Sequence, residues 1–182
     1  MNRLKREFFK QSAFKTAENI LGKYLIRKIG SKKLEGRIVE VEAYLGERDK
    51  AAHVYKGKRT KRNEVVYSGN GLCYIYLVYG IHWQLNITVG GKQSQCLLIR
   101  GLEIEENKNL TNGPGKLCRW LKLDKSFYGE DFVKSRRIWL ENRGGEKEEI
   151  IKTKRVGIDY AEEWKNKKLR FYLKGNKFVS KR

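Results

Sequence analysis

The segment Arg37-Ile38-Val39-Glu40-Val41-Glu42-Ala43-Tyr44 alternates between apolar and polar residues over most of its length. Successive side chains of a β-strand point to opposite faces, so the segment predicts a strand with Val39, Val41 and Ala43 on one face. The residues predicted for the other face are Ile38, Glu40, Glu42 and Tyr44. Two carboxylates about 7 Å apart on one face indicate either a solvated edge or an active site. The pattern by itself favours the solvated edge.

Strand patterns continue on both sides of this segment. Residues 24–29 and 34–44 predict an antiparallel hairpin, because the turn-forming residues 30–33 join them. The further predicted strands are residues 72–79, 83–89, 95–103 and 169–173. Gly90-Gly91-Lys92 suits a tight turn between two of them. A mostly antiparallel sheet is therefore expected at the centre of the protein.

Helical patterns flank the predicted strands. Apolar residues recur every three or four positions over residues 8–21 and Gly22 follows as a stop, which predicts an opening helix with a buried stripe. Shorter helices are predicted at residues 116–121 and 160–168. The segments predicted as surface loops are 46–71, which is long and basic, and 141–152. These elements predict an α+β fold, and the length predicts a single domain over residues 1–182.

The composition indicates a polyanionic partner. The 182 residues include 41 lysines plus arginines against 21 aspartates plus glutamates, a formal net charge of +20. A charge of this size supports many phosphate contacts, whose affinity depends on salt because counterions are released. Nucleic acid is the favoured partner, and charge alone leaves open a ribosomal-type protein, a membrane-surface protein or a basic enzyme.

The cysteines and histidines give little support for a metal site. Cys73, Cys96 and Cys118 are far apart among apolar neighbours and lack the paired spacing of a zinc site, so we predict reduced packing residues. His53 and His82 have no third nitrogen or sulfur ligand at metal spacing. No segment approaches the ~18 apolar residues of a membrane span, and the start lacks the apolar run of a signal peptide. A cytoplasmic protein without membrane association is expected.

Tyrosines and two polar residues of the predicted strands form a second group of interest. Alternation places Tyr74 and Tyr76 on one face, and Tyr79 on the other face or in the turn beyond. Such rings can stack on an extruded base or fill the gap that it leaves, and ordinary strand packing explains any single one equally well. Asn86 falls on a polar strand face. Arg100 interrupts an apolar one, where its charge needs a phosphate or a carboxylate.

Short blocks spread over nearly the whole chain carry a family resemblance. They are RIVEVEAYLG at 37–46, DKAAH at 49–53, TKRN at 60–63, YIYLVYG at 74–80, NI at 86–87, LLIRGLE at 97–103, NGPGKLC at 112–118, DKS at 124–126, RVGI at 155–158 and LRFYLKG at 169–175. No single block is decisive. In this order and spacing, together they resemble the alkyladenine (N-methylpurine, 3-methyladenine) DNA glycosylases of the mammalian type.

The resemblance implies a single compact domain with a curved, mostly antiparallel sheet edged by α-helices. It also implies a protruding β-hairpin that enters the minor groove of duplex DNA, and no metal or organic cofactor. Carried over by position, Tyr79 at the hairpin tip would fill the space left by a flipped nucleotide. Ile81 and His82 would lie beside it against the neighbouring bases.

The base pocket is implied in the same way. Tyr44 and His53 would stack on one face of the flipped base and Tyr76 on the other, an arrangement that favours electron-poor, alkylated rings. Backbone groups around Ala51 and His53 would read the purine edge. Asn86 would exclude undamaged guanine by clashing with its exocyclic amine.

Glu42 matches the catalytic carboxylate of the family, and Arg100 matches the arginine that helps it to position a water near the sugar C1′. Because cleavage passes through an oxocarbenium-like sugar, a carboxylate can both deprotonate the water and stabilise the positive charge. The implied substrates are 3-methyladenine, 7-methylguanine, ethenoadenine and hypoxanthine. No lysine occupies a matched catalytic position, so no lyase step is expected. No general acid for neutral bases is identified, and Glu40 has no assigned role.

Two other classes of function stay open on the sequence alone. The charge and the tyrosines also suit a non-catalytic RNA- or DNA-binding protein. Glu40, Glu42 and Glu103 could instead form the centre of a metal-dependent nuclease. The glycosylase hypothesis predicts a monomer that acts on double-stranded DNA with damaged purines. An abasic-site endonuclease would then receive its product.

Overall fold

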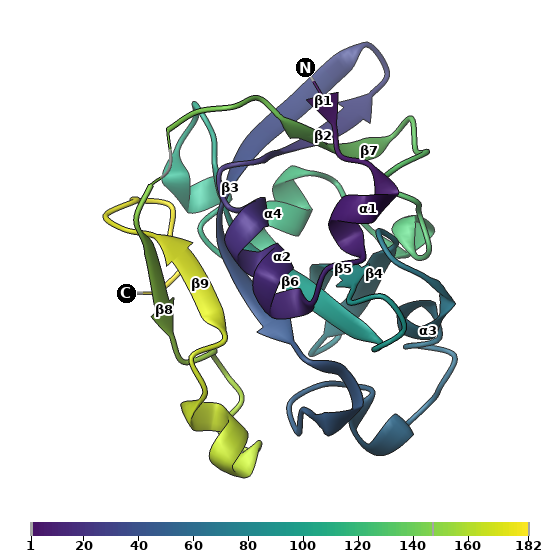
Figure 1. Ribbon diagram of the computed structural model, residues 1–182. Coiled ribbons are helices and arrows are strands. Elements are labelled where there is room, and N and C mark those ends of the chain that lie inside the picture. Colours follow the sequence, from purple (N-terminus) through teal and green to yellow (C-terminus); the bar gives the residue numbers. More distant parts are fainter. Residues whose placement is uncertain (1, 147, 182) are drawn as a thin grey trace.

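The computed structural model describes residues 2–146 and 148–181, and nine strands of this part form one sheet (Figure 1). The strands are β1 (Asn2–Arg3), β2 (Tyr24–Ile29), β3 (Lys32–Tyr44), β4 (Cys73–Val78), β5 (His82–Val89), β6 (Gln95–Glu103), β7 (Ile138–Asn142), β8 (Ile150–Thr153) and β9 (Arg170–Leu173). Their order is β1-β7-β2-β3-β6-β5-β4, and β9 pairs with both β3 and β8. Each of these pairings is antiparallel.

Short helices cover the sheet. They are α1 (Arg6–Phe9), α2 (Ala13–Ile20), α3 (Val65–Ser68) and α4 (Pro114–Trp120), with 3-10 turns η1 (Gly46–Arg48), η2 (Tyr55–Gly57), η3 (Lys108–Leu110), η4 (Lys125–Phe127) and η5 (Glu162–Asn166). α2 packs against β3 and β6, and α4 packs against β5 and β6. The buried residues of α2 and α4 join the same core cluster as the inner residues of the sheet. The α+β prediction is confirmed.

The long strand β3 sits at the centre of the sheet, where it pairs with β2, β6 and β9 (Figure 1). Its register with β6 shifts on both sides of Glu40, an irregularity typical of a β-bulge. The shift corrects one prediction: Ile38 is buried in the core together with Val39, not on the face of the carboxylates. Glu40 and Glu42 share the opposite face, from which both contact Arg100 of β6.

The predicted opening helix over residues 8–21 is wrong, because the segment forms two helices, α1 and α2. Ser12 separates them: its side chain accepts a hydrogen bond from the backbone N–H of Lys15 at 3.3 Å and caps α2. Phe14 also leaves the predicted stripe, since it is 38% exposed and packs edge-on against Phe171. A new helix therefore begins after the N-cap Ser12, although the apolar periodicity continues across this break.

The C-terminal third differs most from the prediction. The predicted loop 141–152 is wrong, because it contains the end of β7 and most of β8, with Lys147 outside the described residues. The predicted helix 160–168 is only the 3-10 turn η5. β7 and β8 are short, with five and four residues, and their hydrogen-bond partners lie in other parts of the chain, in β1, β2 and β9.

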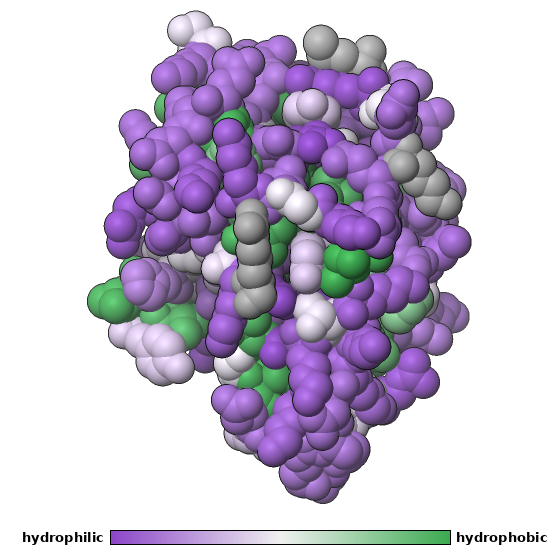
Figure 2. Space-filling model, turned by 90° about the vertical axis from the view of Figure 1, so that its left-hand side faces the viewer, coloured by the Kyte–Doolittle hydropathy of each residue, from purple (hydrophilic) through white to green (hydrophobic). Residues whose placement is uncertain are grey.

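Hydrophilic residues dominate the face of the molecule drawn in Figure 2. Hydrophobic residues show there only as small, separate patches. Cys73, Cys96 and Cys118 are buried free thiols, which confirms their prediction as packing residues. No helix within residues 2–146 and 148–181 combines the length and the apolar character needed to span a bilayer.

Candidate active site and DNA-binding hairpin

A cavity of about 470 Å³ opens on the face of the sheet opposite the core. Its walls come from residues 51–54, the β4–β5 hairpin, β6 and residues 156–160. Strand alternation explains the arrangement: Leu98 and Arg100 of β6 line the cavity, whereas Leu97 and Ile99, which alternate with them, lie in the core. The volume is typical of a pocket for a small ligand such as one nucleobase.

Aromatic side chains make up much of the cavity wall, as the sequence predicts. Tyr44, His53, Tyr74 and Tyr76 all line it. The His53 ring lies edge-on to Tyr76 with centroids 4.7 Å apart, and its Nδ1 is 2.7 Å from the Tyr74 hydroxyl. A base between His53 and Tyr76 would need two contacts of about 3.5 Å. In this conformation the two rings therefore leave no room for a base between them.

His53 is expected to be neutral at physiological pH. Desolvation in the cavity wall, with the nearby charges of Arg62 and Lys58, lowers the pKa of His53 to about 4. Since protonation is harder in the folded state than in the unfolded chain, the folded state loses stability as pH falls from about 6.5 through 4. NMR titration of the imidazole C2–H should show a midpoint near pH 4, well below that of an ordinary histidine. A midpoint near 6.5 would contradict this description of the wall.

The loop beside the cavity is held by a buried ion pair between Asp49 and Arg155. Both side chains have no exposed area, and Arg155 donates to the two carboxylate oxygens at 2.6 and 2.8 Å. Asp49 also accepts from the N–H groups of Leu45 and Ala51, so the Ala51 amide is already taken. The Arg155 guanidinium lies 4.6 Å from the centroid of the Tyr44 ring. One ion pair thus positions both Tyr44 and the 45–51 loop.

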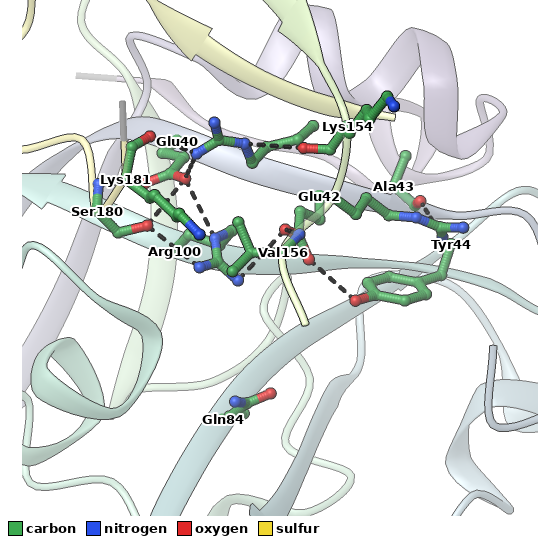
Figure 3. Close-up of polar contacts among 12 residues, drawn as sticks. Glu40, Glu42, Ala43, Tyr44, Gln84, Arg100, Lys154, Val156, Ser180 and Lys181 are labelled. Carbon is green, nitrogen blue, oxygen red and sulfur yellow. Dashed lines mark hydrogen bonds and ion pairs between the residues drawn. The ribbon is translucent and has the colours of Figure 1, made fainter. Parts of the chain in front are cut away.

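Glu42 is fully buried, and its polar contacts are drawn in Figure 3. Its oxygens accept hydrogen bonds from the Tyr44 hydroxyl at 2.9 Å and from the Val156 N–H at 2.8 Å, and Arg100 lies 3.3 Å away. These three partners line the cavity, whereas Glu42 itself does not. Burial and the Glu42 charge raise the pKa of Tyr44, so its hydroxyl remains a donor. The solvated-edge interpretation of the two glutamates is therefore wrong.

Arg100 has the partners that its position demands. Its guanidinium reaches Glu40 at 3.1 Å and Glu42 at 3.3 Å, so of the two kinds of partner that the sequence left open, phosphate and carboxylate, the structure shows carboxylates. Arg100 is the part of the cluster that reaches the cavity. Arg100 therefore contacts the two buried carboxylates on one side and faces the cavity on the other.

The tip of the β4–β5 hairpin protrudes from the protein beside the cavity. Tyr79 is 91% exposed and Ile81 is 69% exposed, unusual values for large apolar side chains. Tyr79 and Gly80 both have positive φ, at 51° and 71°, which makes the turn tight. His82 is half-buried and packs close to Gly115 at the start of α4, so it supports the base of the tip.

Asn86 of β5 is the remaining residue that the resemblance assigns to the pocket. Asn86 lines the cavity from β5, next to Gln84, which accepts a hydrogen bond from the Tyr76 hydroxyl at 3.1 Å. The structure thus brings Tyr44, Ala51, His53, Tyr76, Asn86 and Arg100 around one cavity, with Glu42 behind it.

The sequence reasoning assigned no role to Asp49, Arg155 or Val156. Asp49 and Arg155 fall in blocks that carry the family resemblance. The opposite charges of these two residues were the only feature of the sequence that could have pointed to an ion pair. Nothing in the sequence could identify Val156, because it acts through its backbone N–H. The three carboxylates of the nuclease alternative do not form one cluster. Glu103 does not join Glu40 and Glu42 but accepts a hydrogen bond from Arg37 Nε at 2.6 Å. Across residues 2–146 and 148–181, no three acidic, histidine or cysteine side chains are placed to share a metal ion.

The chain is similar over nearly its whole length to proteins of one known family. Residues 7–177 match the family model described as Methylpurine-DNA glycosylase (MPG). A relative from Desulfitobacterium hafniense (strain Y51), named "Putative 3-methyladenine DNA glycosylase", is 44% identical over 202 aligned positions that cover 99% of each chain. Relatives of the same name are 42% identical in Clostridium perfringens (strain SM101 / Type A), covering 99% of this chain and 100% of their own, and in Borrelia garinii subsp. bavariensis, covering 97% and 99%. The chain therefore belongs to the methylpurine-DNA glycosylase family of DNA repair enzymes.

Proposed function

We propose that this protein flips a damaged purine out of duplex DNA into the aromatic cavity and hydrolyses its N-glycosidic bond, with Glu42 as general base. The observation that carries the proposal is the position of Glu42, a buried carboxylate that contacts three residues of the cavity wall: Tyr44, Arg100 and Val156. A carboxylate held next to a cavity of purine size can act on the sugar of a base bound there.

Binding and flipping use the surface charge and the hairpin. The net charge of +20 supplies phosphate contacts, and the exposed Tyr79 ring fills the gap in the stack that the flipped nucleotide leaves. Ile81 beside it contacts a neighbouring base. Filling the gap offsets part of the cost of unstacking.

Hydrolysis follows from the arrangement around Glu42. A water attacks C1′ and gives a proton to Glu42, while the C1′–N bond breaks and its electron pair leaves with the base. Glu42 also stabilises the positive charge that develops on the sugar. Because Glu42 is covered, this water must displace the hydrogen bond of Tyr44 or Val156 beside Arg100, which already reaches the cavity.

The cavity also supports the finer assignments. Stacking on Tyr44, His53 and Tyr76 favours the cationic bases 3-methyladenine and 7-methylguanine, and the same slot takes ethenoadenine and hypoxanthine. Asn86 faces the slot, where it clashes with the exocyclic amine of guanine. Among the described residues, the cavity lining contains arginines but no lysine that could form a Schiff base. The protein therefore acts as a monofunctional glycosylase. It works as a monomer, and an abasic-site endonuclease receives its abasic product.

Duplexes with one lesion each provide the test. The protein is expected to release 3-methyladenine, 7-methylguanine, ethenoadenine or hypoxanthine, measured as free base, and to leave a strand that breaks only after alkali treatment. Undamaged duplex is the control. Tight binding without release of any base, or a preference for single-stranded RNA in gel shifts, would instead support the non-catalytic binding protein.

A further inference from the structure

Glu40 is a buried carboxylate with no part in the reaction proposed above. It accepts hydrogen bonds from Arg100 Nε at 3.1 Å, from Arg170 Nη1 at 2.7 Å, and from the N–H and hydroxyl of Ser180 at 2.6 and 2.9 Å (Figure 3). A buried carboxylate needs such hydrogen-bond partners, because an unpaired charge in the interior is costly. The C-terminal segment supplies two of these bonds.

The C-terminal segment lies directly against the strand that carries Arg100. Gly101 is the register partner of Glu40, and a Cβ at Gly101 would lie 2.8 Å from the carbonyl oxygen of Phe178. Only glycine allows so close an approach of the two backbones. Arg170 also donates to the carbonyl of Lys181 at 2.7 Å, which keeps the segment in place.

Arg100 is shared between the two glutamates. Its Nε binds Glu40, its Nη1 lies 3.3 Å from Glu42, and its Nη2 donates to the Ser180 hydroxyl at 3.2 Å. A rotation of the guanidinium toward Glu42 alone would break the contacts with Glu40 and Ser180. These two residues therefore fix the orientation in which Arg100 meets Glu42.

The charges of the cluster cancel. Glu40 and Glu42 are fully buried, and the side chains of Arg100 and Arg170 are 8% and 6% exposed. Two negative and two positive charges give a net charge of zero. Without the charge of Glu40, the cluster would carry +1 next to a sugar that becomes positive during bond cleavage. Water screens such a charge poorly at this depth.

We infer that Glu40 is a positioning residue for base release. It holds Arg100 against Glu42 and cancels the excess positive charge of the two arginines, so Glu42 presents its full negative charge to the reacting sugar. The inference rests on the proposed role of Glu42. Other groups near Glu42 stay the same when Glu40 is changed; they are Tyr44, Tyr76, Arg155 and Tyr160.

Single-turnover base release by Glu40→Gln, compared with the Kd for the same duplex, tests this role. We expect release from a 7-methylguanine duplex to slow by about 10- to 100-fold, because one uncompensated charge lies about 7 Å along the strand from Glu42. The Kd for the duplex should stay unchanged. Glu40→Asp should restore most of the rate, because it restores the negative charge.

Glu103→Gln is the matched control, because Glu103 is a half-exposed β6 carboxylate that pairs with Arg37 instead. It should keep the wild-type rate. If Glu40→Gln does not fold, Ser180→Ala should still slow release several-fold, since it removes contacts of both Glu40 and Arg100. A wild-type rate in folded Glu40→Gln, or wild-type rates in both Glu40→Asp and Ser180→Ala when Glu40→Gln is unfolded, would overturn the inference. An inactive wild type would overturn the proposed function as well.

Discussion

Glu42→Gln is expected to abolish base release while lesion binding persists. Glutamine has nearly the same volume and can still accept from the Val156 N–H, but it cannot take the proton of the water. General-base catalysis contributes about 100- to 10,000-fold, and the charge beside the oxocarbenium is lost as well. Single-turnover release from a 7-methylguanine duplex should therefore fall at least about 1,000-fold. Fluorescence anisotropy with the same duplex should give a wild-type Kd.

Glu35→Gln is the matched control for this experiment. Glu35 is on the same strand as Glu42, but it is partly exposed and pairs with Arg143 at 2.7 Å, away from the cavity. Its rate should equal that of the wild type. Full release by Glu42→Gln would remove Glu42 from the mechanism. Loss of both release and lesion binding would mean that the substitution damages the pocket instead.

Asp49→Ala is expected to lower the free energy of unfolding by about 3–5 kcal/mol, because it leaves Arg155 charged and unpaired in the interior. The same change frees the N–H groups of Leu45 and Ala51, which Asp49 now satisfies. Such a loss is a large share of a typical domain stability. Urea denaturation should show it, and the melting temperature should fall by about 10 °C or more.

The double variant Asp49→Ala with Arg155→Met separates the unpaired charge from the lost hydrogen bonds. Removing both charges should recover part of the stability, so the double variant should be more stable than Asp49→Ala alone. Glu64→Ala is the surface control, because Glu64 and its partner Arg59 are both largely exposed. It should cause no measurable loss. If Asp49→Ala also caused no measurable loss of stability, the Asp49–Arg155 pair would not be what holds the loop.

The parts of the fold that were predicted well depend on local patterns. β2 and β6 begin and end where the sequence predicts them, because both are runs rich in apolar residues that lie close to turn-forming glycines. β1, β7 and β8 were missed. Two to five residues carry no clear period, and these strands exist because distant strands supply their hydrogen bonds.

Of the candidate site, too, one part could be predicted from local sequence and another part could not. The residue types around the cavity could be predicted, because several tyrosines on one strand face and a charge on an apolar face are visible in the sequence. The contact between Tyr76 and His53, and the position of Glu42 behind the wall instead of in it, could not. These depend on how the 45–58 loop folds over the sheet, which the Asp49–Arg155 pair controls.

The sequence by itself determined the α+β class, the strongly basic surface, and the pairing of two glutamates on one strand. Those properties follow from composition and from the two-residue period of a strand, which need no distant partner. Only the tertiary structure decided that both glutamates are buried, that Arg100 lies between them, and that the C-terminal segment closes over Glu40. The reason is that burial and ion pairing of a side chain depend on segments more than 50 residues away in the chain, as Arg100 of β6 is from Glu40 of β3.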